Sequence, residues 1–212
     1  LVQAGDFTLE NPNQLTIGEL GLSVNRVTPS ESVLEVADST QSGLTASEGD
    51  INLIARGDLS FLTLSATGNI SLVSESGAII PDSTAGGSIS ATENVSLSAQ
   101  RGIGFSGDGA LQIEGSGLDV ENSGIGSAYL EISGSISLGE VSVTDSGNLY
   151  INQDDGDLTL TEDVSMDSGQ IVLLTDGGIT LNSTIEVESD LRIVAQSFTG
   201  NAAGLVSREG DV

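Results

Sequence analysis

The densest group of side chains that would suit a ligand is the acidic run Asp154-Asp155-Gly156-Asp157, with Asn152 just before it. Carboxylate and amide oxygens are the ligands that Ca²⁺ prefers in proteins. The spacing nevertheless matches neither the EF-hand loop nor the glycine-rich nonapeptide of calcium-binding β-rolls. We therefore interpret the run as a solvated turn. We expect no metal-ligating residue and no cofactor, apart from weak Ca²⁺ binding spread over an acidic surface.

A second candidate is the tripeptide Arg56-Gly57-Asp58, a motif that can engage integrins when it lies on an exposed, flexible loop. Here it occupies a Gly-Asp turn directly before Leu59, so we interpret it as structural. Three glycosylation acceptor sequences begin at Asn69, Asn94 and Asn182. We attribute them to the frequency of Asn and Ser at turns. These two residue types also recur at matching repeat positions, which predicts ladders of stacked polar side chains.

Catalysis in this chain would have to rely on carboxylates. Glycoside hydrolysis needs two of them at a defined separation, and 31 acidic residues leave that question open by count. The chain has no His, Cys or Trp, and its five basic residues are all Arg, so the usual bases and thiol nucleophile are missing. Most connections are short and enclose little space for a substrate. We expect no catalytic or cofactor-binding residues and no enzyme activity. A carbohydrate-active β-helix enzyme is the alternative.

The charge balance restricts the partners of the chain. It carries 31 acidic and 5 basic residues, a formal net charge of -26. Nucleic acids and anionic membrane surfaces are excluded as partners, because both require clustered Lys or Arg. No apolar run is long enough to insert into a membrane. The self-repulsion of such a chain is tolerable where salt screens it, as in extracellular fluid.

The apolar residues predict a core of small aliphatic side chains. Aromatic residues make up 3% of the chain, while Gly is abundant at 28 and Pro scarce at 3. Many tight turns without proline are typical of a β-rich repeat. We find no clustered aromatic or basic patch in the sequence; the two tyrosines are Tyr129 and Tyr150.

The repeated unit is an aliphatic residue, a mostly polar residue and a second aliphatic residue, as in Ile51-Asn52-Leu53. This alternation places both aliphatic side chains on one face of a short strand. A Gly-Asp, Gly-Asn or Gly-Ser turn precedes many of the units. The aliphatic pairs are Ile51/Leu53, Leu59/Phe61, Ile70/Leu72, Val95/Leu97, Leu111/Ile113, Leu118/Val120, Leu130/Ile132, Ile136/Leu138, Val141/Val143, Leu149/Ile151, Leu158/Leu160, Val164/Met166, Ile171/Leu173, Ile179/Leu181, Ile185/Val187 and Leu191/Ile193.

The spacing of these units predicts a right-handed parallel β-helix, a β-solenoid with coils of about 19–22 residues. Two series of equivalent strands carry this prediction. The first is Ile51, Ile70 and Ile89; the second is Leu111, Leu130, Leu149, Ile171 and Leu191. Leu158 with Ile179, and Val164 with Ile185, add two steps of 21 residues. We prefer the right-handed form because the hexapeptides of a left-handed β-helix are not sustained, and a β-sandwich would lack the period.

Two regions differ in regularity. Residues 49–212 follow the repeat, whereas residues 1–48 are either divergent coils or an irregular N-terminal segment. Leu15/Ile17, Leu20/Leu22 and Leu34/Val36 are candidate strands in that segment. The sequence closes on Gly210-Asp211-Val212, which has the form of a further repeat, so we expect a fragment of a longer repeat protein.

The repeats resemble those of filamentous haemagglutinin-type adhesins, which are long bacterial exoproteins exported by two-partner secretion. The resemblance rests on three stretches, Gly49–Leu53, Ser65–Leu72 and Asn94–Ala99, and it covers roughly residues 49–200. It implies a right-handed parallel β-helix at the cell surface that acts in attachment or aggregation. The amino-terminal secretion domain typical of that family is not visible in this sequence.

The sequence therefore predicts a structural stalk or adhesin segment of a large secreted or surface-exposed bacterial protein, acting in attachment, aggregation or biofilm. Its expected partner is a glycan or protein on a host or neighbouring cell. A self-assembling extracellular fibre subunit is the alternative, because strand edges at the ends of a solenoid favour self-association.

Overall fold

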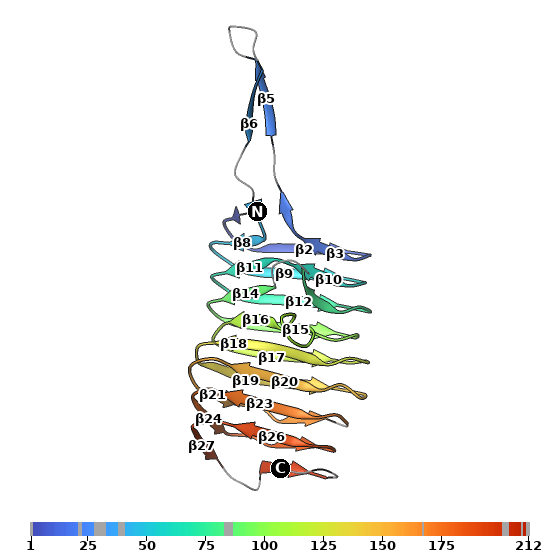
Figure 1. Cartoon of the computed structure of the whole chain (residues 1–212), viewed down its shortest axis with the longest axis vertical. Helices are drawn as coiled ribbons and strands as arrows, with labels where there is room; N and C mark the ends of the chain where they lie inside the picture. The colour runs from blue at the N-terminus through green and yellow to red at the C-terminus, as the bar shows by residue number, and fades with distance from the viewer. Residues whose placement is uncertain are drawn as a thin grey trace.

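The computed structural model describes residues 2–20, 23–27, 33–37, 41–82, 87–166, 168–200, 204–208 and 210. Within these ranges the chain forms a parallel β-solenoid of about seven turns and contains no helix, as predicted. Figure 1 shows the coils stacked along the long axis of the molecule. Right-handed crossovers are the rule between parallel strands, and the handedness of this solenoid stays a prediction. Leu22, Asp211 and Val212, named above, lie outside the described residues.

Parallel sheets run along the stack, and each coil contributes a strand to them. Sheet A contains, in stacking order, β1 (Val2–Gln3), β8 (Leu44–Ala46), β11 (Thr63–Ala66), β14 (Ser88–Ala91), β16 (Leu111–Glu114), β18 (Ala128–Ser133), β20 (Leu149–Gln153), β23 (Ile171–Thr175) and β26 (Leu191–Val194). Sheet B contains β2 (Phe7–Asn11), β9 (Ile51–Ala55), β12 (Ile70–Ser74), β15 (Asn94–Ala99), β17 (Gly117–Asn122), β19 (Ile136–Val143), β21 (Leu158–Leu160), β24 (Gly178–Leu181) and β27 (Ser197–Gly200).

Shorter rows complete the coils. Sheet C consists of β3 (Leu15–Ile17), β10 (Leu59–Phe61) and β13 (Ile79–Pro81). A side branch of sheet B leaves the long strand β19 and consists of β22 (Val164–Met166), β25 (Ile185–Val187) and β28 (Leu205–Ser207). The row of sheet C continues through the bridges of Ile103 to Ile79 and to Ala128, so in later coils it merges into the beginning of sheet A.

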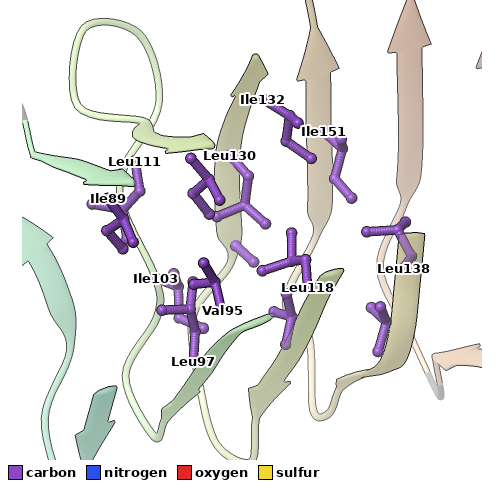
Figure 2. Close-up of a cluster of buried hydrophobic side chains, with 14 of the residues drawn as sticks. Ile89, Val95, Leu97, Ile103, Leu111, Leu118, Leu130, Ile132, Leu138 and Ile151 are labelled. Carbon is purple, nitrogen blue, oxygen red and sulfur yellow. The ribbon is translucent and has the colours of Figure 1, made fainter. Parts of the chain in front are cut away.

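The core is built from columns of aliphatic side chains that repeat from coil to coil. Leu111 pairs with Leu130, which pairs with Ile151, and Figure 2 shows these three side chains in one row. Every residue of the predicted aliphatic pairs is buried except Ile193, which is partly buried. Small branched side chains suit this arrangement because like residues stack at the spacing of about 4.8 Å between neighbouring strands. The alternation therefore predicted the inward face correctly.

The stacking series were predicted correctly only in part. Ile51 pairs with Ile70, but Ile70 then pairs with Val95, and Ile89 instead stacks on Leu64 in sheet A. In the second series, Leu130 pairs with Ile151 and not with Leu149. The steps from Leu149 to Ile171 and Leu191 are confirmed, as are Leu158 with Ile179 and Val164 with Ile185.

Coil length explains these slips. Along sheet B, equivalent residues are 19 apart from Ile51 to Ile70, 25 apart from Ile70 to Val95, and 23 apart from Val95 to Leu118. The predicted range of 19–22 residues is therefore too narrow for two coils. Each of these contains an extra connection, and a uniform period hides such insertions.

The extra connections leave the stack at the same corner, where the row of sheet C turns into sheet A. Among the described coils they lie between β3 and β8, between β13 and β14, and between Ile103 and β16. The first contains two antiparallel pairings, of β4 (Glu19–Leu20) with β7 (Gln41–Ser42) and of β5 (Ser23–Val27) with β6 (Val33–Ala37). Figure 1 shows β5 and β6 beyond the N-terminal end of the stack.

The N-terminal segment contributes to the stack on both sides of that hairpin. Strand β2 pairs with β9, and β3 pairs with β10, in the same parallel register as the later coils. The backbone N–H of Gly43 donates to the carbonyl oxygen of Gly18, which closes the base of the insertion. The chain therefore leaves the first coil and returns to it at one point.

Asp and Asn side chains at the turns join neighbouring coils. The Oδ1 atom of Asp50 accepts a hydrogen bond from the backbone N–H of Asn69 in the next coil, at 2.6 Å. Gly68 must be small there, because a Cβ atom on it would lie 2.1 Å from that oxygen. The same joint links Asp6 to Asp50, Asp58 to Ala78, Asn69 to Asn94, Asp119 to Glu140, Asn148 to Gln170, Asp157 to Gly178 and Asp163 to Thr184.

Candidate functional site: a hollow beside two tyrosines

The Arg56-Gly57-Asp58 tripeptide lies in one of these structural joints. The Oδ1 atom of Asp58 accepts from the backbone N–H of Ala78 at 2.9 Å, and its Oδ2 atom accepts from Nε2 of Gln14 at 3.4 Å. Arg56 is exposed, with its Nε atom 3.8 Å from a carboxylate oxygen of Glu75. Both carboxylate oxygens of Asp58 are thus occupied within the fold, which agrees with the interpretation of the tripeptide as a turn.

The acidic run at residues 154–157 is likewise divided among separate partners. Oδ1 of Asp155 accepts from the backbone N–H of Gly134, and Oδ1 of Asp157 accepts from that of Gly178, both at 2.8 Å. Oδ1 of Asp154 accepts from the side-chain amide of Asn152 at 3.3 Å. In the part of the chain that the structure describes, no group of three acidic residues is arranged to hold a metal ion.

The predicted polar ladder is confirmed at two of the glycosylation acceptor sequences. The side-chain amide of Asn69 donates to Asp50 at 3.3 Å and to Glu93 at 3.0 Å. The side-chain amide of Asn94 donates to Asp119 at 2.7 Å. These amides therefore link successive coils along the turn before sheet B.

The strongest ionic contact in the described residues lies in the last coils. Arg208 donates to the carboxylate of Glu186, and its Nε atom lies 3.3 Å from a carboxylate oxygen of Glu188. The hydrogen bond and charge of Glu186, followed by the charge of Glu188, raise the pKa of Arg208 above its ordinary value. Arginine is charged at any pH at which the chain folds, so this contact does not act as a pH switch.

A different feature emerges on the outer face of sheet A. In β18, Leu130 and Ile132 point inward, so alternation turns Tyr129 and Glu131 outward. In β20 the same alternation turns Tyr150 and Asn152 outward. The register then pairs Tyr129 with Tyr150 and Glu131 with Asn152. Both tyrosines of the chain therefore lie side by side on one face.

The two phenol rings are splayed. Their centroids are 6.2 Å apart and their planes are inclined by 36°. The centroid distance exceeds the step of about 4.8 Å between neighbouring strands, so the rings are not stacked plane on plane. Each tyrosine is about half-buried. This geometry leaves ring surface open on the outer side of the sheet.

The connection of residues 104–110 borders the tyrosines on the side of the preceding coil. It folds on itself through hydrogen bonds from the N–H of Phe105 to the carbonyl of Gly109, at 2.9 Å, and from the N–H of Ala110 to the carbonyl of Gly107, at 3.2 Å. Gly104 and Gly107 have φ angles of 62° and 76°, which favour glycine. A Cβ atom on Gly109 would lie 1.9 Å from the ring of Phe105, so that ring packs directly on the glycine.

Together the connection and the two strands enclose a hollow of about 320 Å³. This volume lies at the lower end of the range for small-ligand pockets in proteins. The lining contains two carboxylates, an amide, a serine hydroxyl and two phenols, and it contains no basic side chain. The lining residues are Ser106, Gly107, Asp108, Ala110, Tyr129, Glu131, Tyr150 and Asn152.

The sequence interpretation missed this hollow. It found no aromatic cluster, and that conclusion is wrong, because the register brings Tyr129 and Tyr150 together. The available signal was their separation of 21 residues, which is one coil length. The connection of residues 104–110 carried no signal of this kind, because its position opposite the tyrosines depends on the register of coils outside the connection.

Comparisons with known proteins add no identification. No family model, no curated protein and no solved structure matches this chain. None of the described residues belongs to a helix that is long and apolar enough to span a membrane.

Proposed function

We propose that this chain is a stalk segment of a large, surface-exposed bacterial protein of the filamentous haemagglutinin type, acting in attachment, aggregation or biofilm. The observation that carries the proposal is the continuity of the buried columns and of the hydrogen-bonded joints from coil to coil. A solenoid of this kind gains length by adding coils while its cross-section stays the same. Such a shape suits a spacer that holds a binding module away from a cell.

The acidic surface supports an extracellular location for the stalk. A net charge of -26 on 212 residues opposes both nucleic acid binding and adsorption to anionic lipid. In a salt-rich medium the same charge keeps neighbouring stalks apart and soluble. The absence of His, Cys and Lys from the sequence supports a structural role over an enzymatic one.

The test is to vary the number of coils in a displayed stalk. The chain is placed between a membrane anchor and a binding module of known ligand on a bacterial surface, and attachment to ligand-coated beads is measured. Removing residues 136–157 brings Leu158 into the place of Ile136, its stacking partner. This in-phase deletion is expected to keep attachment.

Removing residues 136–146 is the matched control, because it shifts the register by about half a coil and breaks the stack. This deletion is expected to abolish attachment. Equal attachment with both deletions would contradict the stalk proposal, because a folded rod would then be unnecessary. Turnover of a polysaccharide by the purified chain would favour the carbohydrate-active enzyme instead.

A self-associating fibre is the second candidate, and one observation favours it. Phe198 stacks on Ile179 in an inward column, yet 41% of its surface is exposed in the described stack. Another coil, from this chain or from a second copy, would cover that apolar surface. Sedimentation of the purified chain over a concentration range distinguishes the two, because fibre assembly predicts growing species and a stalk predicts a monomer.

A further inference from the structure

We propose that the hollow beside Tyr129 and Tyr150 binds a neutral oligosaccharide. The inference rests on the proposed function in one respect, since it gives the surface-exposed stalk a ligand of its own. The shape, the polar lining and the charge of the hollow are its three supports.

The tyrosine pair supplies the apolar part of the site. Aromatic rings provide a large apolar surface with little conformational freedom to lose on binding. The splayed rings span two coils and carry hydroxyl groups at their outer ends. A pyranose ring has an apolar C–H face and a rim of hydroxyls, so it matches a surface of this construction.

The polar groups of the hollow match sugar hydroxyls. Glu131 and Asn152 stand beside the tyrosines on the same two strands, and Asp108 and Ser106 face them from the connection of residues 104–110. Carboxylates accept two or more hydrogen bonds, and the amide and hydroxyl groups both donate and accept. A ligand rich in hydroxyl donors satisfies these groups from both sides of the hollow.

The charge of the hollow selects among carbohydrates. Asp108 and Glu131 are the charged groups in the lining, and no basic side chain compensates them. A sulfated, sialylated or otherwise anionic sugar would bring like charge against these carboxylates, which is repulsive. The surrounding net charge of -26 acts in the same direction. The geometry thus points to uncharged sugars.

Two other ligand classes fit less well. An extended peptide usually binds by adding to a free sheet edge, whereas β18 and β20 already pair with strands on both sides. A quaternary ammonium group prefers several ring faces around it. Here the register places Val172 beside Tyr150, on the side away from Tyr129, and Val172 is buried.

The sequence provides an internal reporter for this site. Tyr129 and Tyr150 are the only two tyrosines, and the chain has no tryptophan. Tyrosine fluorescence of the full chain therefore reports on the hollow alone. The first experiment screens an array of neutral gluco-, manno-, galacto- and N-acetylhexosamine tetrasaccharides with their sulfated and sialylated counterparts, and then titrates each hit by fluorescence and calorimetry.

The expected result is saturable binding of a neutral tetrasaccharide with a change in tyrosine fluorescence. Glu131→Gln and Tyr129→Ala are each expected to weaken binding at least tenfold. Glu121→Gln is the matched control, because Glu121 also faces outward but lies on sheet B; its affinity should equal that of the unmodified chain. Asp108→Asn gives a second test in an exposed connection, in case Tyr129→Ala disturbs folding, which a thermal melt would show.

Other outcomes would overturn the proposal. They are a silent array, binding of only the anionic sugars, binding that leaves the fluorescence and the Glu131→Gln affinity unchanged, or fluorescence-active binding of choline or peptide in place of sugar. Release of reducing ends from the tetrasaccharide would make the hollow an active site. A silent array combined with length-dependent attachment in the display assay would remove the sugar site while leaving the stalk proposal intact.

Discussion

At the scale of the residue, the joints between coils depend on small residues opposite carboxylates and amides. The staple from Asp50 to the N–H of Asn69 is a short hydrogen bond with a charged acceptor, a kind worth more than a neutral one. Its geometry requires Gly68, whose φ angle lies outside the left-handed region, so the requirement there is one of space alone. The Gly-Asp dipeptides therefore reflect packing against the preceding coil.

Replacing Gly68 by Ala tests this joint. The new Cβ atom would meet Oδ1 of Asp50 and displace it from the N–H of Asn69. We expect a loss of about 2 kcal/mol in the free energy of unfolding, the scale of a buried N–H that loses a charged partner. Urea unfolding followed by circular dichroism measures it. Gly18→Ala is the control, since nothing lies within 3.9 Å of its added Cβ atom in the cited contacts, the nearest being at 4.0 Å; an equal loss for both variants would refute the packing argument.

At the scale of the element, the sequence predicted strands and their inward faces but not their pairing. Alternation is a local property, and it identified the buried residue of nearly every pair. Pairing depends on how many residues each connection holds, and Ile89 and Leu149 were assigned to wrong neighbours because insertions of unequal length interrupt the period. The hollow was missed for the same reason, since it exists only once Tyr129 and Tyr150 are in register.

Alternation also gives the direction of a side chain without its role. Asn122 follows Leu118 and Val120 on the inward face and is completely buried. Its Nδ2 atom donates to the carbonyls of Gly124 and Gly126, at 3.0 and 2.8 Å, and its Oδ1 atom accepts from the N–H of Gly102 at 2.9 Å. A single amide thus supports the turn that follows β17 and ties it to the previous coil.

Asn122→Ala is expected to loosen that turn. It leaves two carbonyls and one N–H without a partner in a buried place, and we expect a loss of about 3 kcal/mol in stability. Hydrogen exchange should accelerate at Gly102 and across residues 123–127 while the other coils keep their protection. Ser98→Ala, on the outer face of sheet B, serves as the comparison and should change stability by less than about 0.5 kcal/mol. Uniform acceleration along the whole chain would argue against a local role for the amide.

At the scale of the molecule, stability is a sum over neighbouring coils. Each coil packs against the one before and the one after it, as the strand order of sheets A and B shows. A linear array of this kind responds to a local defect by dividing into separately melting parts. The position of a substitution along the stack therefore matters as much as its size.

Leu130→Ala places a defect near the middle of the stack, between Leu111 and Ile151. Leu130 is 0% exposed, and its truncation is expected to cost about 3 kcal/mol. The two tyrosines lie beside the defect, so tyrosine fluorescence should melt several degrees below the far-ultraviolet dichroism of the whole chain, on the general scale of such losses. In the unmodified chain the two probes should agree more closely. Coincident melts in the variant would contradict the picture of independent neighbours.

The net charge sets a further property of the whole chain. Repulsion among the carboxylates is weakened when salt shortens the Debye length from about 30 Å at 0.01 M to about 3 Å at 1 M. We expect the melting temperature to rise with NaCl. At equal ionic strength, CaCl₂ should add a modest further rise if weak Ca²⁺ binding is spread over the surface. Asp155→Asn should leave that rise unchanged; its loss would instead locate a calcium site in the acidic run.

The orientation of the hydrogen bonds has a mechanical consequence. The bonds between coils run along the axis of the stack, so tension along this axis loads the interfaces one after another instead of shearing many bonds at once. A coil of about 20 residues occupies about 4.8 Å of the axis when folded and about 70 Å when fully extended. Pulling one coil out of the stack therefore lengthens the molecule more than tenfold over that segment. The chain would yield in steps under load and retain the rest of its coils, as an extensible tether does.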